Sequence, residues 1–202
     1  RVPTEQELAA RYRCARATVS KALGELAASG LVERRRKAGT FVAHPPVHSA
    51  VMTGPDLAEL IAARGEAYRW DLLSADADDV GEASCPGPAL RIEGVHMAAG
   101  EAFALELRFI ALGEVPEALG ADFAAEAPGT WLLGHIPWTE ARHVIRAVTP
   151  TRKEAGLLGV SASAACLELD RTTWRAGRVV THVRQLFRGD RFDLVADFNA
   201  GP

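Results

Sequence analysis

The chain opens with RVPTEQELAARYRCARATVSKALGELAASGLVERRRKAGTFVA, residues 1–43, and this segment contains the strongest structural signals of the sequence. Thr4 is followed three residues later by Glu7, a spacing that is typical of a capping box at the start of a helix. We therefore expect a first helix from Glu5 to about Tyr12. A second helix is predicted from Ala15 to Ala28, because its apolar residues recur at intervals of three and four. Two short helices joined by a brief turn form a helix-turn-helix.

The polar side of the second helix is small and basic at its N-terminal end, which suits a helix that enters the major groove of DNA. The candidate DNA-reading residues on this side are Arg16, Thr18, Ser20 and Lys21. Beyond Gly30, residues 31–42 predict two strands joined by a basic turn. Such a hairpin is typical of a wing whose cationic tip reaches the minor groove. Its candidate contact residues are Arg35, Arg36, Lys37 and Gly39.

The charge of the chain is divided unevenly along its length. Residues 1–44 carry nine Lys and Arg against four Asp and Glu, a net charge of +5, whereas the remainder carries −8 and the whole chain −3. A small basic head on an acidic body is expected when only the head meets a polyanion. A solvated charged surface would give the same balance, so charge alone leaves both interpretations open.

The first 43 residues resemble the winged helix-turn-helix of the GntR family of bacterial regulators, because the blocks ARATVSKAL, GLVERR and GTFV occur in order at the right spacing. The resemblance implies that Arg16, Thr18 and Lys21 contact DNA from the recognition helix. It also implies that Thr4 meets a phosphate and that Gly39 lies at the wing tip. Family members normally carry a further helix before this segment, and we expect that first helix to be absent from this chain.

The rest of the sequence predicts a linker and an α+β domain with a mostly antiparallel sheet. Two prolines, Pro45 and Pro46, favour an extended path, and we assign residues 45–54 to the linker. Residues 55–202 form the second domain, in which 55–64, 116–122 and 151–158 read as helices. Strands are predicted at residues 69–74, 90–97, 102–112, 140–148, 167–174, 179–188 and 194–198.

The clearest strand alternates between two faces. Phe103, Leu105 and their apolar neighbours at every second position should face the core. The opposite face presents Glu106 and Arg108, which either form a surface ion pair or line a cleft. The pattern alone does not choose between these alternatives.

Residues from about Pro55 to Phe198 resemble the UTRA effector domain of the HutC subfamily, whose fold is shared with chorismate lyase. The segments that carry the resemblance are RIEGVHMAAGEAFALELRFI, VPEALGADF, PGTWLLGHIPWTEARHVIRAV and VTHVRQLFRGDRFDLVADF. It implies a small effector bound against the sheet and touched by Glu106. Several relatives that bind sugar phosphates place two arginines where this chain has Gly94 and His96, which disfavours a phosphate ligand here.

A urocanate-like effector needs a guanidinium for its carboxylate and polar and flat partners for its imidazole. The candidate effector-binding residues are His96, Glu106, Arg108, Trp131, Glu140, His143 and Arg184, with Trp138 as a further flat wall. Glu140 and His143 could meet across a helical turn, but would lie on opposite faces of a strand. A different small acid or a sugar phosphate from another catabolic pathway is the alternative effector.

We expect a homodimer whose two heads bind the half-sites of an inverted repeat in double-stranded DNA and whose binding responds to the effector. We expect no cofactor, because no phosphate-binding or catalytic motif occurs in a confirming context. Cys14, Cys85 and Cys166 form neither a zinc pattern nor a disulfide framework, so no metal and a cytoplasmic location are expected. We also expect no membrane span and no leader peptide. A lyase-like enzyme and a domain that only dimerises remain as alternatives to a sensor.

Overall fold

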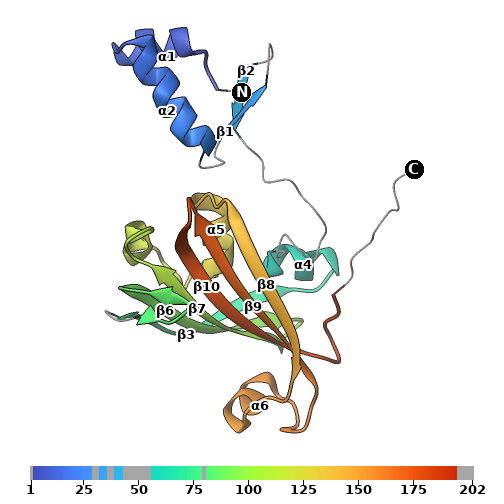
Figure 1. Ribbon diagram of the computed structural model, residues 1–202. Coiled ribbons are helices and arrows are strands. Elements are labelled where there is room, and N and C mark those ends of the chain that lie inside the picture. Colours follow the sequence, from blue (N-terminus) through green and yellow to red (C-terminus); the bar gives the residue numbers. More distant parts are fainter. Residues whose placement is uncertain (1, 29–31, 36–38, 43–55, 79–80, 195–202) are drawn as a thin grey trace, which may run out of the picture.

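The computed structural model describes residues 2–28, 32–35, 39–42, 56–78 and 81–194 (Figure 1). The N-terminal elements are α1 (Glu5–Tyr12), α2 (Arg16–Ala28), β1 (Val32–Arg35) and β2 (Gly39–Val42). The predicted capping box is formed, since Glu7 accepts a hydrogen bond from the backbone N–H of Thr4 at 2.7 Å and donates its own backbone N–H to Thr4 Oγ1 at 3.3 Å. Val19 and Leu23, on the predicted apolar side of α2, are buried.

The wing strands β1 and β2 pair antiparallel, with Val32 opposite Val42 and Arg35 opposite Gly39. The expected wing residues Arg36 and Lys37 and the expected linker 45–54 lie outside the described residues.

The second domain contains a six-stranded antiparallel sheet in the order β3-β6-β7-β10-β9-β8. Its strands are β3 (Tyr68–Asp78), β6 (Ala89–Ala98), β7 (Glu101–Ala111), β8 (Glu140–Val148), β9 (Cys166–Arg175) and β10 (Arg178–Arg188). The remaining elements are α4 (Leu57–Ala63), the short pair β4 (Gly81–Glu82) and β5 (Cys85–Pro86), the 3₁₀ helix η1 (Pro116–Gly120), α5 (Pro128–His135) and α6 (Arg152–Leu158). The predicted α+β class is confirmed.

Six of the seven predicted strands are present, and β3 is longer than expected. Leu194, the first residue of the seventh, is not in a strand, and residues 195–198 lie outside the described part. Helix α5 was not predicted: its N-cap, Ala127, offers no capping side chain, although Pro128 at its first position is a helix-start signal in the sequence. No helix in the described part of the chain is long and apolar enough to cross a membrane.

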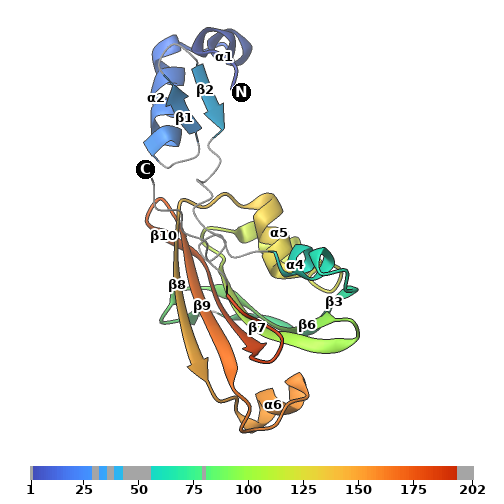
Figure 2. The ribbon, with the colours of Figure 1, turned by 90° about the vertical axis from the view of Figure 1, so that its right-hand side faces the viewer.

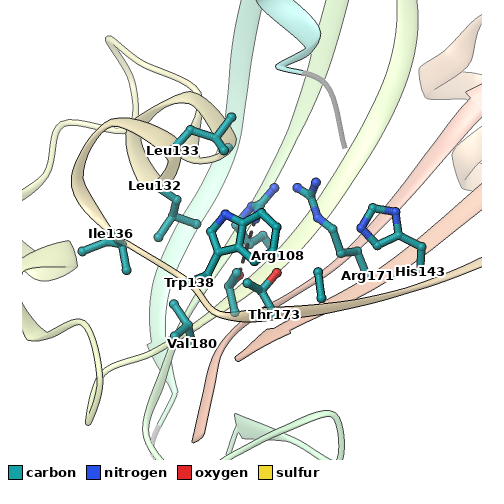
Figure 3. A pocket seen from close by; sticks show the side chains of 12 residues that line it. Arg108, Leu132, Leu133, Ile136, Trp138, His143, Arg171, Thr173 and Val180 are labelled. Carbon is teal, nitrogen blue, oxygen red and sulfur yellow. Dashed lines mark hydrogen bonds between the residues drawn. The ribbon is translucent and has the colours of Figure 1, made fainter. Parts of the chain in front are cut away.

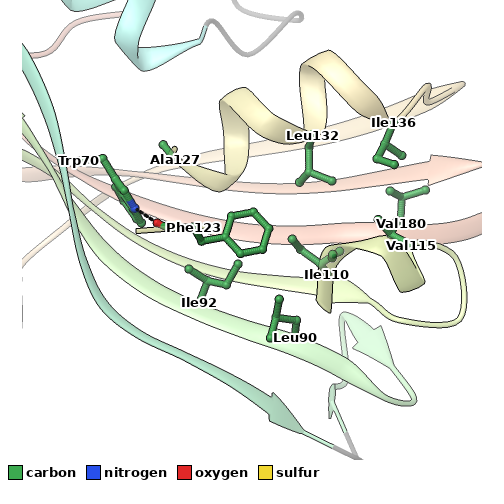
Figure 4. Packing of buried hydrophobic residues seen from close by; sticks show 11 residues of the cluster. Trp70, Leu90, Ile92, Ile110, Val115, Phe123, Ala127, Leu132, Ile136 and Val180 are labelled. Carbon is green, nitrogen blue, oxygen red and sulfur yellow. Dashed lines mark hydrogen bonds between the residues drawn. The ribbon is translucent and has the colours of Figure 1, made fainter. Parts of the chain in front are cut away.

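Helices α4 and α5 lie next to each other over the inner side of the curved sheet (Figure 2). Leu132 of α5 and Ile136, the residue that follows the helix, pack against Ile92, Ile110 and Val180 of the sheet (Figure 4). Leu57 and Ile61 anchor α4 among phenylalanines at the end of the same face. Helix α6 packs through Leu158 on the other face, with Val95, Leu105 and Leu186. Both faces of β7 are therefore covered, so the Glu106–Arg108 pair is not on the surface.

Candidate functional site

A chain of buried polar side chains crosses the inner face of the sheet, from β3 to β10. Tyr68 Oη lies 3.0 Å from Nδ1 of His96, and Nε2 of His96 lies 3.0 Å from Oε2 of Glu106. Nε of Arg108 donates to Oε1 of Glu106 at 2.6 Å, and Gln185 Nε2 donates to Oε2 at 2.6 Å. Glu106 thus accepts three hydrogen bonds although it is only 2% exposed.

The partners of Glu106 hold its carboxylate in the ionised form. Burial raises the pKa of Glu106, but the positive charge of Arg108 and the hydrogen bond from His96 outweigh it and hold that pKa well below its usual range. Because the Glu106 carboxylate accepts, Nε2 of His96 is the donor of their hydrogen bond, and the Tyr68 hydroxyl faces Nδ1 on the other side of the ring. Burial and the charges of Glu106 and Asp56 raise the pKa of Tyr68, so its hydroxyl keeps its proton.

These contacts fix the direction of the Arg108 guanidinium. Nε of Arg108 is committed to Glu106, and Nη1 lies 3.4 Å from Thr181 Oγ1, whose hydroxyl donates to the Phe109 carbonyl at 2.8 Å. Nη2 is buried and has no hydrogen-bond partner among the described residues. It points at the first turn of α5, where a β-carbon on Gly129 would lie 3.3 Å from it.

A cleft opens between the sheet and α5 at this point (Figure 3). The centre of a water-sized sphere can occupy about 30 Å³ within it, and the non-atom space is about 440 Å³ when the open mouth is included. Its lining is apolar on the helix side and polar on the sheet side. The lining residues are Arg108, Gly129, Leu132, Leu133, Ile136, Trp138, Ala141, His143, Arg171, Thr173, Val180 and Thr181.

Arg171 and His143 bring a second cation and an imidazole to the cleft. They are opposite each other in the β8–β9 pair, and Arg171 is opposite Val183 in the β9–β10 pair. Burial and the charge of Arg108 lower the pKa of Arg171 to about 10, partly offset by Glu106, so Arg171 remains positively charged at neutral pH. The guanidinium groups of Arg108 and Arg171 point away from the sheet on the same side (Figure 3).

The other candidate effector residues lie elsewhere. Glu140 is exposed on β8, and the strand puts it on the face opposite His143. Arg184 lies on the outer face, where its Nε donates to Glu168 and its Nη1 to Glu154, each at 2.6 Å. Trp131 stacks on His135 at 4.7 Å between ring centroids and does not line the cleft.

Sequence reasoning missed Arg171, Thr173, Thr181 and Gly129 as cleft residues. The first three alternate along β9 and β10 and share a face with Arg108 through the strand register, so a known register would have found them. Gly129 lies in α5, whose start the sequence marks with Pro128 but with no capping side chain.

In the head, Arg16, Thr18 and Lys21 are exposed and Ser20 is half-buried. Nε of Arg16 donates to Oε2 of Glu5 at 3.0 Å, which links the start of α2 to α1. The hydroxyl of Thr4 is exposed and also donates to Glu7 at 2.8 Å. Within the described ranges, no group of three or more His, Cys, Asp or Glu is arranged to hold a metal ion.

Comparison with known proteins matches both parts of the chain to family models. Residues 1–42 match "Bacterial regulatory proteins, gntR family", and residues 71–193 match the UTRA domain. The histidine utilization repressor of Klebsiella aerogenes is 34% identical over 207 residues, which cover 99% of this chain and 86% of that protein. The corresponding repressor of Pseudomonas putida is 32% identical, with 98% and 83% covered.

Among solved structures, PhnF from Mycobacterium smegmatis superimposes with a TM-score of 0.65 at 27% identity, covering 99% of this chain and 92% of that one. The C-terminal domain of the histidine utilization repressor from Pseudomonas syringae gives 0.61 at 25% identity, covering 66% of this chain and 99% of that one. With a basic winged head and a sheet that carries a cleft, the chain belongs to the GntR family of bacterial regulators, as a transcriptional repressor of the HutC type with a UTRA domain.

Proposed function

We propose that residues 1–44 bind an operator and that a small metabolite in the cleft of residues 55–202 controls this binding through the linker 45–54. The metabolite is a monocarboxylate of histidine catabolism, urocanate or a related compound. The protein acts in the cytoplasm as a homodimer, so that its two heads meet the half-sites of an inverted repeat. It is a sensor and does not convert its ligand.

The buried Nη2 of Arg108 is the observation that carries the choice of ligand. A buried donor without an acceptor is costly, so this position favours a ligand that supplies one. A carboxylate oxygen is well suited, because charge-assisted hydrogen bonds to guanidinium are about twice as strong as neutral ones. Arg171 adds positive charge on the same side of the cleft. Glu106 and His96 act as positioning residues, since they orient Arg108 and do not line the cleft.

The rest of the cleft suits a flat heteroaromatic ring. Trp138 and His143 line it together with leucines of α5. An indole face offers an apolar wall, and an imidazole offers a hydrogen bond in the plane of a second ring. These are the requirements of the imidazole end of urocanate.

The surroundings of Gly94 support a ligand without a phosphate. A β-carbon on Gly94 would lie 2.2 Å from Cη2 of Trp70, so the indole fills the space that a longer side chain would need. Trp70 is held there by a hydrogen bond from its Nε1 to the Phe123 carbonyl at 2.9 Å. Compared with the relatives that bind sugar phosphates, this position therefore offers fewer cationic groups to a dianionic phosphate.

Calorimetry on the full chain tests the ligand, with urocanate, urocanate methyl ester and glucosamine 6-phosphate as probes. Of the three probes, only urocanate should show saturable binding, because the ester lacks the negative charge that Arg108 recognises. Urocanate should also weaken operator binding in fluorescence anisotropy. Equal binding of the ester, or tighter binding of the sugar phosphate, would contradict the proposal. Chromatographic recovery of unchanged urocanate after prolonged incubation separates a sensor from an enzyme.

Two glycines of α5 offer a matched pair of variants. Gly129→Ala places a methyl group 3.3 Å from Nη2 of Arg108, whereas a β-carbon at Gly134 meets nothing within 4 Å. Both changes favour the helix. Gly129→Ala should weaken urocanate binding about tenfold, since one methylene in a binding pocket changes affinity by roughly 10–200-fold. Gly134→Ala should leave urocanate affinity unchanged, and equal losses in both variants would place the ligand elsewhere.

A further inference from the structure

Asp56 lies where the segment from the DNA-binding head enters the second domain. It is the N-cap of α4 and the first described residue after 43–55, the segment that joins α4 in sequence to the wing strand β2. Its Oδ1 accepts two hydrogen bonds, from the backbone N–H of Ala58 at 2.9 Å and from the hydroxyl of Thr130 at 3.0 Å. The second bond connects positions that are 74 residues apart in the sequence.

Thr130 lies in the first turn of α5, directly after the cleft residue Gly129. The unpaired Nη2 of Arg108 points at this same turn. A ligand group that binds Nη2 must therefore lie against the first turn of α5. One side of this turn faces the cleft, and the other side holds Asp56 through the Thr130 hydroxyl.

Two kinds of contact hold α4. Leu57, its first residue, and Ile61 are buried in a cluster with Phe103 and Phe187, which fixes the helix on the sheet. Asp56, the residue before Leu57, caps the helix with its half-buried carboxylate. A helix of seven residues gains little from its own backbone, so its first turn is sensitive to its cap. A change at Asp56 consequently alters the point where the linker leaves the domain.

We infer that the Thr130–Asp56 hydrogen bond couples occupation of the cleft to the linker, and hence to the DNA-binding head. This inference rests on the proposed function, because it needs an effector in the cleft. Ligand shifts the first turn of α5, the Thr130 hydroxyl moves relative to Asp56, and the cap of α4 changes with it. Thr130 and Asp56 are positioning residues in this scheme, and neither needs to touch the ligand.

Thr130→Val tests the coupling, because valine keeps the shape of threonine and removes only the hydroxyl. The full chain is titrated with urocanate and with operator DNA, each alone and in the presence of the other. We expect urocanate affinity without DNA to stay within about twofold of wild type. The factor by which urocanate weakens operator binding should fall at least threefold. Because coupling is reciprocal, the factor by which operator weakens urocanate binding must fall equally.

Thr151→Val is the control, because it makes the same substitution at another helix start, on the other side of the sheet. There the Thr151 hydroxyl is itself the N-cap of α6 and accepts the backbone N–H of Glu154, with no link to the cleft turn. This variant should keep the full coupling factor. Asp56→Asn, which retains the Oδ1 acceptor for both donors, should also keep most of it. A wild-type coupling factor in Thr130→Val overturns the inference while the proposed function stands. Failure of urocanate to bind the wild-type chain overturns the proposed function and the inference with it.

Discussion

Glu106 holds the polar chain of the inner face together. Three donors converge on its carboxylate, and two of them, His96 and Arg108, come from positions at which the sequence also suggested a role. The third, Gln185, is brought in by the β7–β10 pairing. Removal of the carboxylate charge leaves the Arg108 guanidinium buried without its counter-charge, which is expected to cost about 3–5 kcal/mol. Glu106 therefore contributes to stability as well as to the orientation of Arg108.

The depressed pKa of Glu106 predicts a specific pH dependence. A carboxyl whose pKa is lowered by folding stabilises the folded state above its unfolded pKa, and this stabilisation is lost as the pH falls toward the folded pKa. Glu106→Gln should therefore lower the free energy of unfolding most at pH 7, and the difference from wild type should shrink between pH 5 and pH 3. Urea denaturation at several pH values measures this difference. A difference that does not vary with pH would mean that folding does not lower the pKa of Glu106.

Gly94 shows how a single position depends on its neighbours in space. It lies within β6, where glycine is unfavourable for a strand, and only the Trp70 indole explains its presence. The Trp70 ring also lies 4.7 Å from that of His96, between centroids, so the tryptophan packs against the polar chain as well. The sequence contains Gly94 and Trp70 but does not indicate that they meet.

At the scale of elements, the turn between α1 and α2 sets the direction of the recognition helix. Arg13 ends α1 in the left-handed conformation, with φ of 50°, and donates its backbone N–H to Ala9. The ion pair between Glu5 and Arg16 spans the same turn. Arg16 is 75% exposed, so this pair adds little to stability and mainly restricts where the guanidinium lies.

Glu5→Gln should change DNA selectivity more than it changes folding. Without the carboxylate, Arg16 is less restricted and the head is more positive, so affinity for random duplex should rise relative to the operator. The ratio of operator to random-DNA affinity should fall about fivefold or more, since a well-placed arginine–guanine pair discriminates by about 1–3 kcal/mol. Anisotropy titrations at several salt concentrations measure the ratio. Glu25→Gln removes the same charge farther along α2, and an equal fall there would assign the effect to charge alone.

At the scale of the whole molecule, the division into a basic head and an acidic body leads us to expect that DNA contacts are confined to the head. One head covers only one half-site, and the proposed dimer then requires two half-sites on the same side of the duplex. Their spacing should be about 34–36 Å, one helical turn, or a multiple of it.

Operators of altered spacing test this arrangement. Insertion of about 5 base pairs between the half-sites rotates one of them to the opposite side of the DNA, and insertion of about 10 restores the side. We expect the first insertion to reduce affinity to that of a single half-site. The second should recover much more of the affinity if the linker tolerates the added length. Electrophoretic mobility shifts report both values, and an affinity that ignores spacing would contradict binding as a two-fold dimer.

The sequence alone determined the features that depend on neighbours along the chain. Thr4 and Glu7 cap α1 through hydrogen bonds between residues three apart, and alternation sorts the side chains of β7 from Ala104 to Ile110 onto two faces. The predicted alternation was wrong at Phe103, because the irregular pairing of β6 with β7 places Phe103 with α4 on the inner face, whereas Leu105 packs with α6 on the other face. Local signals such as these also located six strands of the sheet and separated Glu140 from His143 once a strand was assumed. Helix capping and side-chain alternation both follow from local backbone geometry, which depends on residues that are close together in the sequence.

Only the tertiary structure decided which of those faces became a site. Glu106 and Arg108 are buried because α4 and α5 cover the inner face, and the sequence marks the start of α5 only with Pro128 at its first position and with no capping side chain. Arg171 reaches the cleft through the register of β9 on β10, and Arg184 is excluded from it by the same register. Burial, strand register and helix placement depend on contacts between residues far apart in the chain, so periodicity along one segment does not determine them.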